Sequence, residues 1–453
     1  MATQPLRVQE GDPAAEQIET TRQREKALSR MVMTYISTGL FFMLLPGTFL
    51  GVWNLLSISA AKEPAAVSPA WIQAHGHAQV FGWIGSFILG IGFYSIPKMR
   101  RAQAFALWEA WVCWAMWTSG VLLRWFGGVY QWHWRVAVPL SAGLELLAFL
   151  IFFRTVSSHR PAASADGVHP KLDRWILVVI AGTVGWLATL IANLAESVNI
   201  ALHASSPAFA ASFDARFLIL MAWGFIVPFV WGFSARWLPT FLGLREISAR
   251  ALMLVVAMNA AGVLFALAGL VRVAVFLLLA AAVGSWIALR LAMPPIKPAK
   301  TQGVHSSFPY FVRLAYGWLV VAAALGVWAA FAQHSEGIWG ASRHALTVGF
   351  IATMVFAIGQ RVLPAFSGMR LLYSPKLMGL NLGLLSIGCL LRVSSEVWAY
   401  QGIAAWAWET LPISAVIELT AVTLFAANMI ATFLSRPLGA RLVHIAQARR
   451  RAV

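Results

Sequence analysis

The sequence predicts an all-α polytopic membrane protein of about twelve transmembrane helices. Of its 453 residues, 60% are hydrophobic and only 11% are charged, whereas soluble domains carry about 25% charged residues. Apolar runs long enough to cross a bilayer as helices recur along the whole chain. We expect these helices at 31–57, 78–97, 104–125, 136–155, 174–194, 217–238, 250–270, 273–293, 310–331, 345–363, 376–396 and 411–434.

Hydropathy leaves eleven or twelve helices open, because only Arg272 separates the seventh helix from the eighth. The distribution of Lys and Arg favours twelve. With both chain ends in the cytoplasm, 27 of the 34 Lys and Arg residues fall on the cytoplasmic side. The net charge of +17 therefore marks cytoplasmic loops, so we expect the lipid bilayer as a partner and no nucleic acid. The predicted domains are a cytoplasmic tail at 1–30, a single transmembrane domain at 31–434 and a basic cytoplasmic tail at 435–453.

The transmembrane domain contains an internal repeat. HAQVFGWIGSFILGIGFYSIP at 77–97 and HALTVGFIATMVFAIGQRVLP at 344–364 share Gly five, Gly fifteen and Pro twenty residues after the His. A fainter copy ends at Pro239 and has Ile219 in place of the His. Because the copies share one topology, we expect parallel repeats around an axis along the membrane normal. The predicted four-helix blocks are 31–155, 174–293 and 310–434.

The stretch HGHAQVFG at 75–82 places His75 and His77 at the predicted start of the second helix. His344 starts the tenth helix at equal depth, so His77 and His344 face each other if the blocks surround one axis. Two facing imidazoles suit a bis-histidyl haem, and we predict them as ligands of a haem b. His75 points about 200° away from His77 on a regular helix, so we expect it to bind a second centre such as copper. Solvated loop residues and buried hydrogen-bond donors stay open as alternatives for these histidines.

Three arginines fall at the predicted outer helix ends, at the level of the histidines: Arg124, Arg343 and Arg392. Haem propionates need cationic partners, and guanidinium groups bind carboxylates with two parallel hydrogen bonds. Arginines that reach from a helix end to the membrane surface are the alternative. Because it adjoins His344, Arg343 is the preferred candidate of the three.

Two glutamates occupy matching places in the first and third blocks. PLSAGLELLA at 139–148 parallels PISAVIELTA at 412–421, which sets Glu145 opposite Glu418. A carboxylate inside a membrane is costly and therefore indicates a function. We expect Glu145 and Glu418 to handle protons or ions, with pairing to a nearby arginine as the alternative.

These motifs resemble the NnrS family of twelve-helix bacterial membrane proteins. The resemblance rests on HGHAQVFG at 75–82, RHALTVGFIATM at 343–354 and RVLP at 361–364, and it covers most of the chain past residue 30. It implies haem and copper as cofactors, a place in the cytoplasmic (inner) membrane, and protection against nitric oxide and nitrosative stress. Gln79 stands where many members are expected to have an acidic residue, so an acid-dependent role of the motif is in doubt.

The arrangement is also distantly similar to the catalytic subunit of haem-copper oxidases and nitric oxide reductases. Those proteins hold their low-spin haem between helices 2 and 10, so the resemblance implies His77 and His344 as axial ligands. Their copper ligand in helix 6 has no counterpart, because LILMAWGFIVPFVWG lacks a histidine. We therefore expect no binuclear centre of the usual kind.

Three functions stay open from the sequence, and it does not decide whether the protein is an enzyme. The favoured one is a haem protein that senses, binds or converts nitric oxide or a similar small gas, with a respiratory electron donor as a further partner. The second is a transporter built from parallel repeats, with Glu145 and Glu418 along its path. The third is an accessory or assembly subunit of a respiratory complex.

Overall fold

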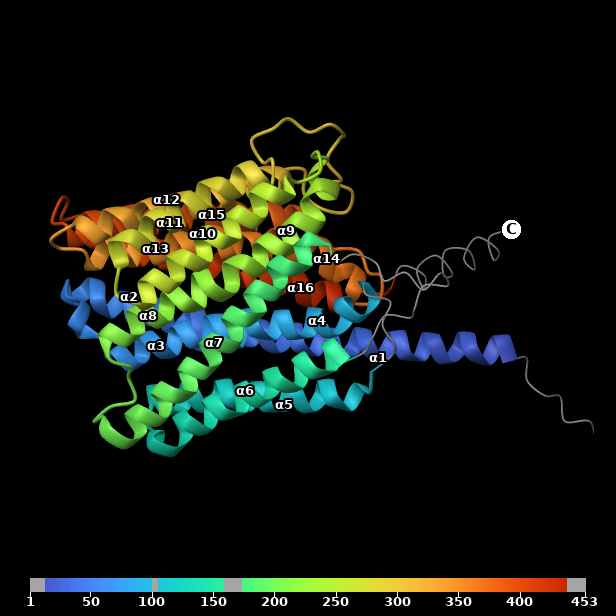
Figure 1. The fold of residues 1–453 in the computed structure, drawn as a ribbon, viewed down its shortest axis with the longest axis horizontal. Helices are drawn as coiled ribbons and strands as arrows, with labels where there is room; N and C mark the ends of the chain where they lie inside the picture. Colours follow the sequence, from blue (N-terminus) through green and yellow to red (C-terminus); the bar gives the residue numbers. More distant parts are fainter. Residues whose placement is uncertain (1–12, 100–104, 159–172, 438–453) are drawn as a thin grey trace, which may run out of the picture.

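The computed structural model describes residues 13–99, 105–158 and 173–437, and within these ranges the chain forms helices and loops without any strand (Figure 1). Twelve long helices make up the fold, and four of them contain a π-helical segment (η). In chain order they are α1–η1–α2 (Pro13–Phe42, Met43–Phe49, Leu50–Ala61), α3–η3–α4 (Pro69–His77, Ala78–Gly85, Ser86–Met99), α5 (Leu107–Val129), α6 (Trp134–Ser158), α7 (Arg174–His203), α8–η4–α9 (Ala211–Ile219, Leu220–Ile226, Val227–Leu242), α10 (Ala249–Leu267), α11 (Val271–Ala288), α12 (Phe308–Phe331), α13–η5–α14 (Glu336–His344, Ala345–Ala352, Thr353–Phe366), α15 (Pro375–Tyr400) and α16 (Ala407–Leu434).

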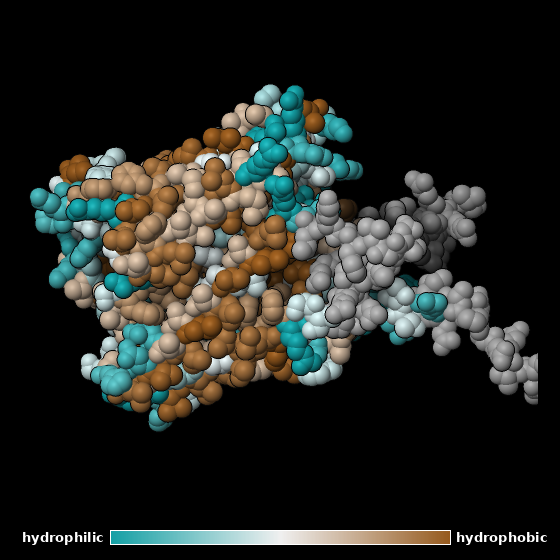
Figure 2. Space-filling model, viewed as in Figure 1, coloured by the Kyte–Doolittle hydropathy of each residue, from teal (hydrophilic) through white to brown (hydrophobic). Residues whose placement is uncertain are grey.

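The all-α membrane class is confirmed. Eleven helices in the described ranges are long and apolar enough to cross a bilayer. The twelfth, α5, is rich in Trp but has 23 residues, about 35 Å of helix, which exceeds the hydrocarbon thickness. The weak boundary near Arg272 is real, because α10 and α11 separate at Gly269, whose φ of +85° ends the first helix. Figure 2 shows an apolar belt around the middle of the bundle with hydrophilic residues at both ends.

Helices 2, 6 and 10 in chain order form the centre of the bundle. In α3–η3–α4, α8–η4–α9 and α13–η5–α14, the most apolar windows are 78%, 72% and 72% buried, against 33 to 50% in the other spans. The η segment begins nine residues after the helix start in all three, at Ala78, Leu220 and Ala345. These positions directly follow His77, Ile219 and His344, which the sequence repeat aligns. Single-turn π-helical bulges occur frequently at functional sites, so these three repeated positions are candidates for a functional site.

The expectation that the histidines start their helices is wrong. His77 and His344 each lie eight residues inside their helix, about 12 Å from its first residue. The preceding turns, PAWIQAHG and EGIWGASR, are too polar and small to be recognised from hydropathy, so the apolar run begins later than the helix. The histidines are therefore set into the bundle rather than at its rim.

Neighbouring blocks meet through their terminal helices. The last helix of the first block, α6, packs on α7, and α11 packs on α12 in the same way. The last helix of the chain, α16, packs on α2 and η1, so the bundle closes on its first helix. This is the contact pattern of three blocks in a ring, although their arrangement around a common axis stays a prediction.

The N-terminal helix passes through the predicted boundary between tail and membrane domain. Helix α1 runs without a break from Pro13 to Phe42 and extends beyond the bundle on the right of Figure 1. Residues 1–12 of the predicted N-terminal tail and 438–453 of the predicted C-terminal tail lie outside the described residues.

Candidate functional site

The predicted ligands gather at the end of the bundle where α3, α8 and α13 begin, on the left in Figure 1. We call this the histidine end. His77 is 8% exposed, whereas His75 and His344 are half-buried. Helix α2, whose Gly51 lies against His75, packs on α16, so the first and third blocks meet here.

His75 is anchored through one ring nitrogen. Its Nδ1 lies 2.8 Å from the carbonyl oxygen of Gly47 in η1. Because a carbonyl can only accept, Nδ1 carries the proton, and Nε2 of the neutral ring keeps its lone pair. The ring packs over Gly51, where a Cβ atom would come within 2.5 Å of its Cε1 atom.

His344 has its proton on the same ring nitrogen, Nδ1. Its Nδ1 lies 2.9 Å from the carbonyl oxygen of Gly340 and 3.0 Å from Oε2 of Glu396. Both partners are acceptors, so Nδ1 donates and Nε2 of the neutral ring is unprotonated. The guanidinium of Arg392 lies 3.4 Å from Nε2, which is long for a hydrogen bond. A backbone carbonyl or carboxylate on the other nitrogen is also the usual way in which proteins orient a metal-ligating imidazole.

His77 is engaged differently. Its Nε2 lies 2.7 Å from Oε1 of Glu145, and its ring stacks on Phe81 at a centroid distance of 4.4 Å. The second oxygen of Glu145 accepts a 3.3 Å hydrogen bond from Asn193 on α7, and the carboxylate is fully buried. Of the predicted roles for Glu145, the structure therefore supports pairing, but with His77 in place of an arginine.

Glu418 occupies the equivalent position without equivalent partners. Glu145 lies against Gly120 and Glu418 against Gly388, each glycine four residues before an arginine of the repeat. Among the described residues, Oε1 of Glu418 is buried and has no hydrogen-bond partner. The predicted proton or ion role thus stays open for Glu418 as a prediction.

The three arginines differ in burial: Arg124 is buried, Arg392 is half-buried and Arg343 is exposed. Arg124 is 4% exposed and lies over the ring of Phe209 at 4.4 Å. Within the described ranges, Nη1 of Arg124 and Nη1 of Arg392 are buried and have no hydrogen-bond partner. Arg343, the preferred candidate from sequence, is exposed, and its Nε bonds to the carbonyl oxygen of Trp339. Two guanidinium groups, each with a buried free donor, indicate a place for an anion.

A sequence model of the NnrS protein family matches residues 33–437. The chain belongs to the NnrS family. Among solved structures, a haem-copper terminal oxidase determined by cryo-EM as a dimer is similar with a TM-score of 0.56 and 13% sequence identity. The match covers 91% of this NnrS chain and 85% of the oxidase chain, and at this identity it shows the fold alone. Among curated proteins, none matches the sequence.

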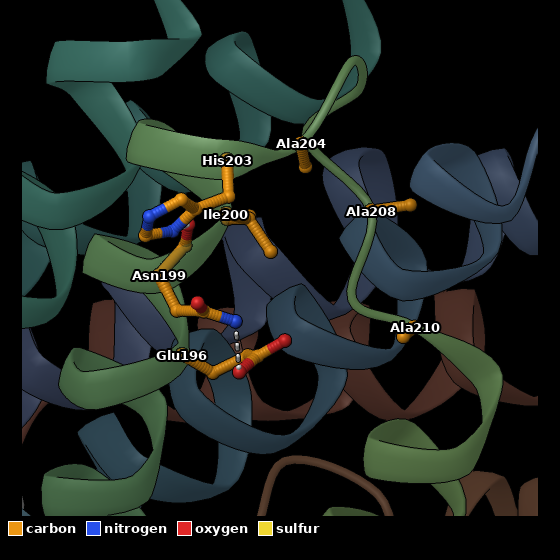
Figure 3. Close-up of a pocket in the computed structure, with 7 residues that line it drawn as sticks. All are labelled: Glu196, Asn199, Ile200, His203, Ala204, Ala208 and Ala210. Carbon is orange, nitrogen blue, oxygen red and sulfur yellow. Dashed lines mark hydrogen bonds between the residues drawn. The ribbon is translucent and has the colours of Figure 1, made fainter.

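One pocket of the NnrS chain is lined by none of these groups. It has a volume of about 220 Å³ and sits where α7 ends, as Figure 3 shows. Glu196, Asn199 and His203 project from successive turns of α7, with a 3.1 Å bond from Asn199 to Glu196. His203 bonds through Nδ1 to the carbonyl oxygen of Asn199 in its own helix, at 3.1 Å.

Sequence reasoning missed Glu396, although a signal was present. Glu396 follows Arg392 by one helical turn, a spacing at which opposite charges pair, and the two side chains lie 3.4 Å apart. Asp214 on α8 was also missed, and its carboxylate is close enough to interact with Arg124 and Arg343. The middle block, which has no ligand histidine at the repeated position, therefore contributes charge to the histidine end.

Proposed function

We propose that this NnrS protein is a haem-binding protein of the bacterial inner membrane that acts in the nitric oxide stress response. The observation that carries the proposal is that the proton of the neutral ring is on Nδ1 in both His75 and His344. Each uses Nδ1 to donate to a backbone carbonyl, at 2.8 and 2.9 Å, so that Nε2 of the neutral ring is unprotonated, with Nε2 of His344 also 3.4 Å from Arg392. Supporting this, the two side chains come from different blocks, and α2 beside His75 packs on α16 of the block that contains His344.

The haem ligands are thus His75 and His344, in place of the pair predicted from the repeat. His77 is the less suitable of the two neighbouring histidines because its Nε2 already contacts Glu145 at 2.7 Å. A ligand role for His77 would have to use Nδ1, because Nε2 is bonded to the buried Glu145. The proposed role of His77 is to orient Glu145 and to link the first block to α7.

Arg124 and Arg392 are the proposed partners of the haem propionates. Both guanidinium groups have a buried Nη1 without a partner among the described residues, and Arg392 is also paired with Glu396. Leaving a buried charged donor unpaired costs more than leaving a neutral one, so an anion at this place stabilises the protein. Arg343 is too exposed to contribute comparably.

When bound, haem supplies a one-electron redox centre, and nitric oxide and a respiratory electron donor are its proposed partners. Copper stays an expectation from the family. In the described part of the chain, no group of three or more His, Cys, Asp or Glu side chains is arranged to hold a metal ion.

The test is the optical spectrum of the purified protein in detergent. We expect a reduced-minus-oxidised spectrum of haem b and a spectral change when nitric oxide is added to the reduced protein. A preparation that is folded but contains neither haem nor metal, also after haem is supplied during expression, contradicts the proposal. That result would favour the transporter or the accessory subunit.

A further inference from the structure

We propose that η1 and Gly51 form a seat that fixes the orientation and tautomer of His75, and that this seat is specific to the first block. The seat consists of Gly47, Thr48, Gly51 and Gln79. The inference rests on the proposed function in one respect, because it takes His75 as a haem ligand. The residues of the seat are positioning residues, since they act on the haem through the imidazole.

The π-helical turn exposes backbone acceptors to neighbouring helices. Pro46 lies inside η1 and has no N–H group, so the regular ladder of backbone hydrogen bonds cannot continue through it. Three carbonyl oxygens of this turn accept side-chain donors, and that of Gly47 also accepts the backbone N–H of Leu50. The carbonyl of Met43 accepts from Thr48 at 2.8 Å and from Gln79 at 3.4 Å. The carbonyl of Pro46 accepts from Trp125 at 3.3 Å. The carbonyl of Gly47 lies 2.8 Å from Nδ1 of His75.

Gln79 ties the seat to the helix that carries His75. Its Nε2 also donates to Oγ1 of Thr48 at 2.9 Å, so helix 2 is held to η1 one turn after the histidine. Gly47 lies directly beneath this side chain, because a Cβ atom there would come within 2.7 Å of the Gln79 Nε2 atom. An amide can donate to both acceptors, which gives Gln79 a role that an acidic residue could not take.

The third block provides an internal comparison. The sequence LGVW occurs at 50–53 and again at 325–328, so Gly326 is the counterpart of Gly51. A Cβ atom at Gly51 would meet the ring of His75 at 2.5 Å, and a Cβ atom at Gly326 would meet Oγ of Ser342 at 3.6 Å. Ser342 stands two residues before His344, as His75 stands two before His77.

The hydrogen bonds of the two blocks match as well. His75 bonds to the carbonyl oxygen four residues before Gly51, and Ser342 donates at 2.8 Å to the carbonyl oxygen of Ala322, four residues before Gly326. There, however, α12 is an unbroken α-helix. The small side chain of Ser342 bonds to a regular α-helix. The larger imidazole of His75 instead faces a π-helical turn and lies against a glycine. The difference between the blocks therefore indicates that η1 and Gly51 accommodate His75.

The first experiment compares Gly51→Ala with the matched control Gly326→Ala in the full-length protein reconstituted with haem. We expect Gly51→Ala to shift the low-spin haem signal in electron paramagnetic resonance and the reduction potential, because the added methyl group rotates or displaces the His75 ring. Gly326→Ala should leave both unchanged, since its Cβ makes only ordinary contacts. Equal spectra and potentials for wild type and Gly51→Ala overturn the seat.

A second experiment does not depend on haem, so it separates this inference from the proposed function. Gly51→Ala should lower the Tm of the protein without haem by about 1–3 °C, and the loss should disappear when His75→Ser is also present. If Gly51→Ala costs the same stability with and without His75, the seat is refuted. If the coupling is found but wild type binds no haem, the seat holds and the proposed function fails.

Discussion

The Nε2 atom of His77 lies 2.7 Å from Oε1 of Glu145, and both side chains are buried between the first and second blocks. A carboxylate at this depth is stable because His77 and Asn193 satisfy its two oxygens. Removal of one partner leaves the others without a bond in a region that water does not reach. The pair is therefore a structural link whose loss should be measurable as stability.

Glu145→Leu should lower the free energy of unfolding by about 3–5 kcal/mol, the usual cost of breaking a buried pair. The matched control is Glu418→Leu in the third block, which should be close to neutral because Oε1 of Glu418 has no partner among the described residues. Thermal unfolding of both variants in the same detergent checks this. An equal loss of unfolding free energy in both variants would contradict this prediction, because it would show that Glu145 and Glu418 stabilise the fold equally.

The arginines should differ in their effect on haem binding. Arg392→Ala removes a charge-assisted hydrogen bond of about 1.5–3 kcal/mol, which corresponds to a roughly 10- to 100-fold weaker haem affinity. Arg343→Ala should stay within about twofold of wild type, because its side chain is exposed. Titration of haem into the haem-free variants distinguishes the two. A larger loss for Arg343→Ala would instead favour the residue preferred from the sequence.

Gly340 holds the space for Glu396. A Cβ atom at Gly340 would clash with Oε1 of Glu396, whose other oxygen lies 3.0 Å from Nδ1 of His344. The methyl group added in Gly340→Ala should therefore displace Glu396 from the His344 ring. The haem reduction potential should shift as a result. Gly317→Ala on α12 is the control, because nothing lies within 4 Å of a Cβ atom there. An unchanged potential in Gly340→Ala would mean that Glu396 does not orient His344.

The sequence was sufficient for the membrane class, the helix count and the matching positions of Glu145 and Glu418. These follow from hydropathy and from the spacing of residues in the repeat, both of which are local properties. It was also sufficient to bring His75, His77 and His344 to one end of the bundle.

The sequence could not decide which of the two neighbouring histidines uses its Nε2 atom within the protein. That choice depends on Gly47 and Glu145, which lie on other helices and have no spacing relation to His75 or His77. A repeat also favours the residue that recurs, and here the recurring His77 is the one with a carboxylate partner. The exposure of Arg343 likewise depends on how α13 packs, which its sequence does not reveal.

The central claim is that His75 and His344 bind one haem, and it is tested most directly by the haem-to-protein ratio of four purified proteins. These are wild type, His75→Ala, His344→Ala and His77→Ala. The account predicts one such haem in wild type, its loss or conversion to a high-spin form in His75→Ala and His344→Ala, and a low-spin haem in any folded His77→Ala protein. A low-spin haem that persists in His75→Ala and disappears in His77→Ala would contradict the account and restore the pair predicted from the repeat.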